Sequence, residues 1–316
     1  MDINLVNEII SCMPKERTIF RYFKDRYAFM LLERFIGEGE SVATIKRSSF
    51  SGLLNKPDVK LAIANAGKGI LTSTILNSVW PEDTHHFILT LGSWGSNSRR
   101  WDQTSRRGYN LVLQLNFSNE HDEQYKRMAK PKFESILNFI GHPILELEER
   151  DYFRETLAWS RIDLDFDKNE VLIEEIQCDW LRRAKNLLRN ARFYRERNIN
   201  MSNRWGFTGS LDNIIKYCEE VLLPYNKIWS EAMLAATIEF IDKELGIKNI
   251  YYHSDSTGYK VKKIKYDKPP RSLYSKLPSK FCFSKTNNAP DFLLQDKNFK
   301  QIYKKVDNPE WYRMAI

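Results

Sequence analysis

The sequence predicts an α+β fold with a mixed, largely antiparallel central sheet flanked by helices. Three stretches carry the apolar pattern of strands, at residues 87–91, 108–117 and 156–180, and polar loops or turns separate them. Elsewhere apolar residues recur three and four positions apart, as on one face of a helix, most clearly at 3–37 and 227–246. Strands that follow one another through turns pair antiparallel, so most of the sheet is expected to be antiparallel.

The chain divides into two expected units, a helical N-terminal subdomain at 1–80 and an α+β domain at 81–316. Apolar spacing predicts two helices over 3–37, which end at Gly37-Glu-Gly. Residues 41–66 then have a helix-turn-helix rhythm. This rhythm fits a small DNA-binding unit, but it fits a helical cap on the main domain as well.

Composition points to a globular protein with polyanionic partners. Among 316 residues, 49 Lys and Arg stand against 41 Asp and Glu, which gives a net charge of +8. This excess favours nucleic acid or nucleotides as partners, although a basic surface can also simply be solvated. No apolar run is long enough for a membrane span, so a membrane partner is not expected. The cysteines form no C-x-x-C pair and are interpreted as free thiols of a reducing compartment, which predicts a cytoplasmic location.

The clearest local pattern is a hairpin whose second arm is Val-Leu-Ile-Glu-Glu-Ile-Gln-Cys-Asp-Trp at 171–180. Side chains alternate along a strand, so Glu175, Gln177 and Asp179 are expected to share one face. Buried polar groups cost several kcal/mol unless they are paired, so these three must meet cations, a ligand or backbone amides. They are therefore candidate catalytic residues.

Two alternatives apply to this polar face. In the first, Arg161 or Arg183 pairs with it and the residues close one end of the sheet as a structural network. In the second, Arg161 helps to bind a substrate. The sequence leaves both open.

A strongly basic helix is expected directly after the hairpin. Seven basic residues and one acid lie between Arg182 and Arg197, so the charge is nearly all of one sign, unlike an ordinary solvated helix face where opposite charges offset one another. This predicts a helix that faces phosphate, with Arg182, Arg183 and Arg189 as binding residues. A basic surface helix without a ligand is the alternative.

The C-terminal third supplies further candidate residues. A long helix at 227–246 precedes a short strand that ends at His253, which could act as a general base. A basic stretch at 260–280 follows. Lys227, at the start of the long helix, and Lys260 and Arg271, in the basic stretch, are candidate phosphate-binding residues.

Two family resemblances start from these segments. The helix, the strand and the sequence Pro270-Arg-Ser-Leu-Tyr-Ser-Lys-Leu-Pro-Ser-Lys-Phe resemble the closing half of a GNAT acyltransferase domain, where a second helix carries A-x-x-L-Y-x-K-x-G-F. Leu273, Tyr274, Lys276 and Phe281 occupy the matching places. This resemblance implies a GNAT-like fold, acyl-CoA as cofactor and Tyr274 as a substrate-binding residue.

The block from Leu157 to Trp180 is similar to the E-I-Q-S-D-W domain of large phage polyvalent proteins and their bacterial relatives. This likeness implies a setting in phage-host conflict. The chain departs from the GNAT pattern at one point, because Leu223-Pro-Tyr-Asn replaces the glycine-rich turn that holds the pyrophosphate of acyl-CoA. Lys227 could still meet a phosphate there as a point charge.

A different chemistry is possible on the same hairpin. Asp163 or Asp165, followed by Glu175 and Gln177, approximates the spacing of restriction-like nucleases, in which two carboxylates hold Mg²⁺ and a third polar group orients water. Asp165 and Glu175 are the metal-binding candidates of this alternative. The expected functions are therefore a GNAT-like enzyme acting on a nucleic acid or nucleotide-linked substrate, a Mg²⁺-dependent nuclease, or a non-catalytic nucleic-acid-binding protein.

Overall fold

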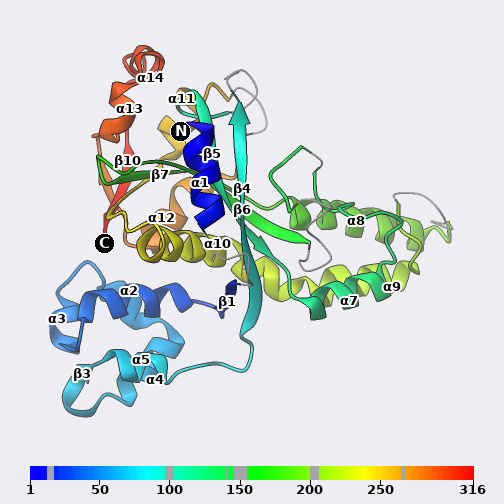
Figure 1. Ribbon diagram of the computed structural model, residues 1–316. Coiled ribbons are helices and arrows are strands. Elements are labelled where there is room, and N and C mark those ends of the chain that lie inside the picture. Colours follow the sequence, from blue (N-terminus) through cyan, green and yellow to red (C-terminus); the bar gives the residue numbers. More distant parts are fainter. Residues whose placement is uncertain (13–17, 97–102, 140, 146–154, 200–205, 265–267) are drawn as a thin grey trace.

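Eight strands form one sheet in the order β1-β4-β5-β6-β7-β8-β10-β9 (Figure 1). Neighbouring strands are antiparallel except for β7 and β8, which are parallel. The computed structural model describes residues 1–12, 18–96, 103–139, 141–145, 155–199, 206–264 and 268–316. Within these residues the expected α+β fold, with a mixed and mostly antiparallel sheet flanked by helices, is confirmed.

The strands of this sheet are β1 (Thr18–Tyr22), β4 (His85–Ser96), β5 (Gly108–Asn116), β6 (Thr156–Asp165), β7 (Glu170–Gln177), β8 (Asn249–His253), β9 (Ser284–Thr286) and β10 (Trp311–Ala315). The helices around it are α1 (Ile3–Cys12), α7 (Asn119–Met128), α8 (Asp179–Glu196), α9 (Leu211–Lys216), α10 (Leu223–Lys243), α11 (Asp255–Val261), α12 (Lys276–Lys280), α13 (Asp291–Gln295) and α14 (Lys297–Tyr303). A π-helical turn, η4 (Tyr217–Val221), and a 3₁₀ turn, η5 (Arg271–Tyr274), complete this part.

A smaller helical unit lies beside the main sheet and its helices, at the lower left of Figure 1. It consists of α2 (Arg26–Ile36), β2 (Glu40–Ser41), α3 (Val42–Lys46), η1 (Ser51–Asn55), α4 (Pro57–Ala64), η2 (Gly67–Gly69), β3 (Ile70–Leu71) and α5 (Ser73–Asn77), with β2 and β3 paired. Two ion pairs tie this unit to α10, Lys24 Nζ to Glu231 Oε1 at 2.5 Å and Arg34 Nη2 to Asp242 Oδ2 at 2.8 Å.

The structure differs from the sequence expectation near the N-terminus. Residues 18–22 were expected to be helical, because Ile19, Tyr22 and Phe23 have helical spacing, but they form β1 and pair with β4. In the strand, Phe20 and Tyr22 point into the core while Ile19 is 59% exposed. Helix α1 packs against β4 and β5, so residues 1–12 and 18–22 lie with the main sheet rather than with the helical unit.

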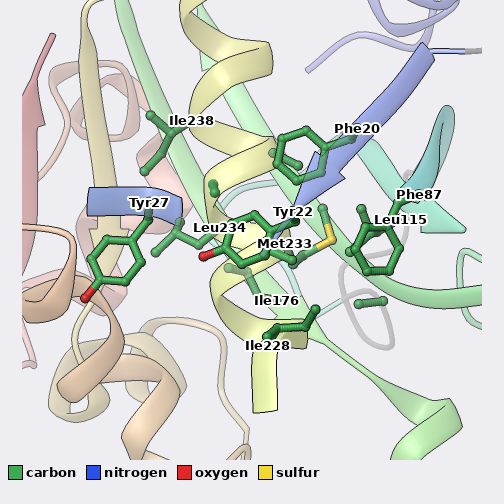
Figure 2. Close-up of a cluster of buried hydrophobic side chains, with 14 of the residues drawn as sticks. Phe20, Tyr22, Tyr27, Phe87, Leu115, Ile176, Ile228, Met233, Leu234 and Ile238 are labelled. Carbon is green, nitrogen blue, oxygen red and sulfur yellow. The ribbon is translucent and has the colours of Figure 1, made fainter. Parts of the chain in front are cut away.

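One face of the sheet is apolar and is covered by α10. Helix α10 is buried on nearly all sides because α2 packs on the side that faces away from the sheet. Figure 2 shows Met233, Leu234 and Ile238 of α10 among Ile176 of β7 and Leu115 of β5. Among the described helices, none has the length and apolar character needed to cross a membrane.

The opposite face has an apolar part and a polar part. Helices α11, α13 and α14 cover the apolar part, around Leu172 of β7 and Trp311 of β10. Over β4, β5 and β6 the same face is polar although it is buried, as at Gln114 and Asn116. Gln114 Nε2 donates to the Pro143 carbonyl at 3.1 Å, so part of the segment 141–145 lies on this polar face.

Strand β7 has a bulge that changes which side chains share a face. Glu175 pairs with Arg161 and Ile173 with Ile162, so Glu174 is the additional residue. Pairing between β7 and β8 runs from Glu170 to Ile173 and then stops, although β7 continues to Gln177. The two parallel strands therefore separate at Glu174, and the expected hairpin of β6 and β7 is confirmed.

A tight backbone contact holds the chain between α7 and α9. Gly209 N donates to the Ala129 carbonyl at 3.0 Å, and Lys132 N donates to the Gly206 carbonyl at 2.8 Å. A Cβ atom at Gly209 would lie 2.8 Å from the Ala129 oxygen and closer still to the Met128 oxygen. Backbone atoms cannot move aside as a flexible side chain can, so this position requires glycine.

We predict that Gly209→Ala lowers the free energy of unfolding by about 2 kcal/mol or more, because the added methyl overlaps the backbone of α7. Gly52→Ala is the matched control, since a Cβ there meets nothing within 4 Å. It should change stability by less than about 1 kcal/mol. Urea denaturation of both variants measures the difference, and equal stability would contradict the close contact.

Candidate functional site

The strongest candidate site lies where β7 ends and α8 begins. Asp179 is the first residue of α8, and its side chain is only 1% exposed. His142 Nδ1 lies 2.6 Å from Asp179 Oδ2. Gln177 Nε2 and Arg182 Nη2 lie 2.8 Å and 2.5 Å from Asp179 Oδ1. One buried carboxylate therefore fixes three side chains from two elements and a loop.

The hydrogen bond to Asp179 sets the tautomer of His142. An ionised carboxylate can only accept, so Asp179 requires the proton of His142 on Nδ1 and leaves the lone pair of an uncharged ring on Nε2. Gln177 Nε2 also lies 3.0 Å from Nδ1, and it donates to Asp179 Oδ1. The side chain of His142 is 25% exposed, and within the described part of the chain its Nε2 has no hydrogen-bond partner. A histidine held in this way by a buried carboxylate is the usual arrangement of a general base.

Asp179 is suited to this role because it stays ionised. Burial alone would raise the pKa of Asp179, but the hydrogen bonds from His142 and Gln177 and the charge of Arg182 outweigh burial and lower it. The carboxylate can therefore stabilise a positive charge on His142 when the ring accepts a proton.

Aromatic rings surround His142. The ring centroids of Trp94 from β4, Trp159 from β6 and Phe139 lie 6.1, 5.7 and 4.6 Å from its own. Phe139 is 45% exposed, and the guanidinium of Arg183 lies 5.4 Å from its centroid. Exposed rings next to cations can stack with the bases of a nucleotide and neutralise its phosphates.

A second cluster, the buried ion network, fills the space where β7 and β8 separate. It consists of Glu174, Glu175, Arg161, Lys262 and His253, and each of these residues is at most 7% exposed. Arg161 donates to Glu175, and Lys262 Nζ donates to the Glu174 carbonyl at 2.9 Å. Two carboxylates thus balance two cations, which makes their burial tolerable.

Arg161 also connects the buried ion network to the first site. Its guanidinium lies 5.3 Å from the ring centroid of Trp94 and 5.9 Å from that of Trp159. The same two indoles flank His142. Arg161 therefore contacts both Glu175 and the two indoles that flank His142.

His253 does not form a hydrolase triad. Ser105 Oγ and Glu174 Oε2 approach the same nitrogen, Nε2 of His253, at 3.0 and 3.1 Å, whereas a triad needs one partner on each nitrogen. Its Nδ1 has no partner among the described residues, and the ring is 0% exposed. Burial holds the pKa of His253 below its ordinary value, so it is a neutral member of the network.

The phosphate-binding candidates expected from the sequence are dispersed. Arg189 of α8 and Lys260 of α11 are exposed, and Arg271 pairs with Asp255 at 3.2 Å. Lys227 lies on α10, which covers the opposite face of the sheet from His142. Tyr274 is buried with its ring 5.5 Å from that of Tyr252, and neither hydroxyl has a partner in the described structure.

The residues expected for a nuclease are far apart. Asp165 pairs in register with Glu170 at the hairpin turn, while Glu175 pairs with Arg161. Four positions of β6 separate Asp165 from Arg161, the partner of Glu175, which is about 13 Å. Within the described ranges, no group of three or more His, Cys, Asp or Glu side chains is placed to hold a metal ion.

Sequence reasoning did not identify His142, Ser105 or Lys262 as members of these clusters. His142 follows Gly141 in a loop, and nothing nearby in the sequence relates it to Asp179, 37 residues later. Lys262 belongs to the basic stretch at 260–280, from which only Lys260 and Arg271 were predicted to bind phosphate. Only the folded chain brings them to the strand.

Comparison of the chain with protein-family models, with curated proteins and with solved structures gave no match.

The buried ion network predicts how stability depends on pH. Burial raises the pKa of Glu174, but the hydrogen bond from His253 and the charges of Lys262 and Arg161 lower it to about 2. Since the folded pKa is below the unfolded one, this stabilisation is present above about pH 4.5 and is lost as the pH falls towards 2. It amounts to about 3 kcal/mol.

We therefore expect Glu174→Gln to unfold with a weaker dependence on pH than the wild type between pH 5 and pH 3, as urea denaturation would measure. Glu220→Gln, at a side chain that is 65% exposed, should follow the wild-type pH dependence. Parallel curves for Glu174→Gln and the wild type would contradict the ion network.

Proposed function

We propose that this protein is an enzyme that modifies a nucleic acid or a nucleotide-linked substrate, with His142 as the general base. The observation that carries the proposal is the 2.6 Å contact between His142 Nδ1 and Asp179, which leaves Nε2 available at a partly exposed position. Aromatic and cationic side chains next to it, Phe139 and Arg183, match the base and the phosphate of such a substrate.

The chemistry that fits this base is transfer of an acyl group to a hydroxyl or amine of the substrate. The acceptor attacks an acyl thioester and its proton moves to Nε2 of His142. A new C–O or C–N bond forms, the C–S bond breaks, and the proton then passes from His142 to the departing thiolate. Asp179 stabilises the imidazolium between the two transfers.

The GNAT resemblance supports the choice of a transferase. The order of α10, β8, η5 and α12 agrees with the helix, strand and second helix that the sequence resembles. Leu273 and Tyr274, at the matching places, are buried residues of η5, and the Tyr274 ring lies 5.5 Å from that of Tyr252 in β8. The family assignment itself remains part of this proposal.

Acyl-CoA is the donor that this resemblance implies. It cannot bind in the gap where β7 and β8 separate. Side chains of the buried ion network fill that space. The N-terminal part of α10, with Lys227, lies on the apolar face, so it does not face His142. The donor site is therefore expected beside His142.

Of the two other functions, one is favoured by a specific observation. Exposed Lys185 and Arg189 on α8 also suit a non-catalytic nucleic-acid-binding protein. The Mg²⁺-dependent nuclease has less support, because Asp165 and Glu175 lie at different ends of the hairpin.

The test uses acetyl-CoA with nucleoside monophosphates and with single-stranded DNA and RNA oligonucleotides as acceptors. We expect one acceptor to gain the acyl mass in intact-mass spectra while free thiol is released. His142→Asn should slow both by about 10²- to 10⁴-fold, the usual contribution of a general base. Asp179→Asn should slow them as well, because the ring loses the acceptor that fixes its tautomer.

His86→Asn is the matched control, since His86 is exposed on β4, where it pairs with Arg21 of β1. It should retain the wild-type rate. Equal rates for His142→Asn and the wild type would rule out His142 as the base. Tight oligonucleotide binding without any covalent change would favour the non-catalytic alternative.

A further inference from the structure

We propose that α8 carries a track for single-stranded nucleic acid that leads to His142. The track consists of Arg182, Lys185, Arg189 and Phe193, together with Phe139 at its beginning. This inference rests on the proposed function and narrows its substrate from nucleotides in general to a polymer with unpaired bases.

Intramolecular ion pairs divide the basic residues of α8 into two groups. Arg192 pairs with Glu219 of η4, and Arg195 Nη1 lies 3.4 Å from Asp212 Oδ1 of α9. Lys185 and Arg189 have no acidic partner anywhere in the described ranges. The first group therefore fixes α8 to its neighbours, while the second leaves positive charge for an external anion.

Lys185 and Arg189 lie on the side of α8 that faces solvent, together with Arg182 and Phe193. Positions 182, 185, 189 and 193 are three or four residues apart and so follow one face of the helix. The buried side is formed by Ala184, Leu187 and Ala191. Arg182 is 60% exposed even though it also contacts Asp179. The track is therefore a continuous exposed row.

Aromatic rings with guanidinium groups mark both ends of this row. At the end of α8, Phe193 is 43% exposed, and the Arg197 guanidinium lies 3.9 Å from its ring centroid. Near the beginning, Phe139 is 45% exposed beside Arg183. Rings of this kind stack with bases, and the cations between them meet phosphates.

This arrangement favours single-stranded nucleic acid over a duplex. Bases inside a duplex are stacked on one another and cannot reach the rings of Phe139 and Phe193, whereas unpaired bases can turn outward. Arg182 and Phe193 are 11 residues apart, about 16 Å along the helix, which corresponds to about five nucleotides at stacked spacing.

The track points to the proposed base. Figure 1 shows α8 running outward from the end of β7, with α7 and α9 beside it. Its first turn holds Arg182 against Asp179, the carboxylate that orients His142. A strand lying on α8 would therefore present a terminal or internal nucleotide at His142.

The test measures binding of a fluorescein-labelled 12-nucleotide single strand, as DNA and as RNA, by fluorescence anisotropy at several salt concentrations. The double variant Lys185→Glu/Arg189→Glu should bind about tenfold more weakly or worse and should show a shallower salt dependence, since phosphate contacts are lost. Lys300→Glu/Lys304→Glu, on α14 and at its C-cap, makes the same change in net charge and should bind within about twofold of the wild type.

A second variant tests stacking. Phe193→Ala should weaken single-strand binding about fivefold or more with an unchanged salt dependence, and a duplex of equal length should bind more weakly than the single strand. The inference is overturned if both double variants lose affinity equally, if Phe193→Ala binds like the wild type, or if the wild type does not bind the oligonucleotide.

These outcomes are separate from those of the proposed function. Binding is measured without a donor, whereas transfer to a mononucleotide does not involve the far end of α8. A cooperative unfolding transition in urea for each variant shows that the variant is folded at the start. An oligonucleotide that fails to bind would thus remove the track and leave the test of His142 unchanged.

Discussion

Two adjacent carboxylates, Glu174 and Glu175, are buried where β7 separates from its parallel neighbour, and the surrounding structure depends on their neutralisation. Arg161 and Lys262 supply the opposite charges, and His253 and Ser105 satisfy further oxygens. Removing one partner of such a network would leave a buried charge, which usually costs about 3–5 kcal/mol. The bulge at Glu174 places both carboxylates in the network and brings Gln177 to the polar face.

The same interaction adjoins the candidate site without being part of it. Arg161 lies against Trp94 and Trp159, and these indoles flank His142. The reaction is therefore expected at the end of β7, where the side chain of His142 is partly exposed. It is not expected in the buried space between β7 and β8. The charged residues of β7 thus have a structural role, while His142 in the loop provides the reactive group.

The sequence predicted the hairpin of β6 and β7, the helices α8 and α10, and the polar character of Gln177 and Asp179, because each of these has a local pattern. It did not predict β1, whose apolar spacing also fits a helix, or the bulge, which breaks strict alternation. His142 was missed because its partner lies 37 residues away, and the acids that neutralise Arg192 and Arg195 come from other elements. Tertiary contacts of this kind leave no local signal.

The most direct measurement is the tautomer of His142, by two-bond ¹H–¹⁵N correlation spectra of protein labelled at the imidazole nitrogens. The chain has five histidines, and loss of one signal set in His142→Asn assigns the ring. We predict that the uncharged ring has its proton on Nδ1, since Asp179 can only accept. In Asp179→Asn this preference should disappear. A proton on Nε2 in the wild type would contradict the role of His142 as a base oriented by Asp179.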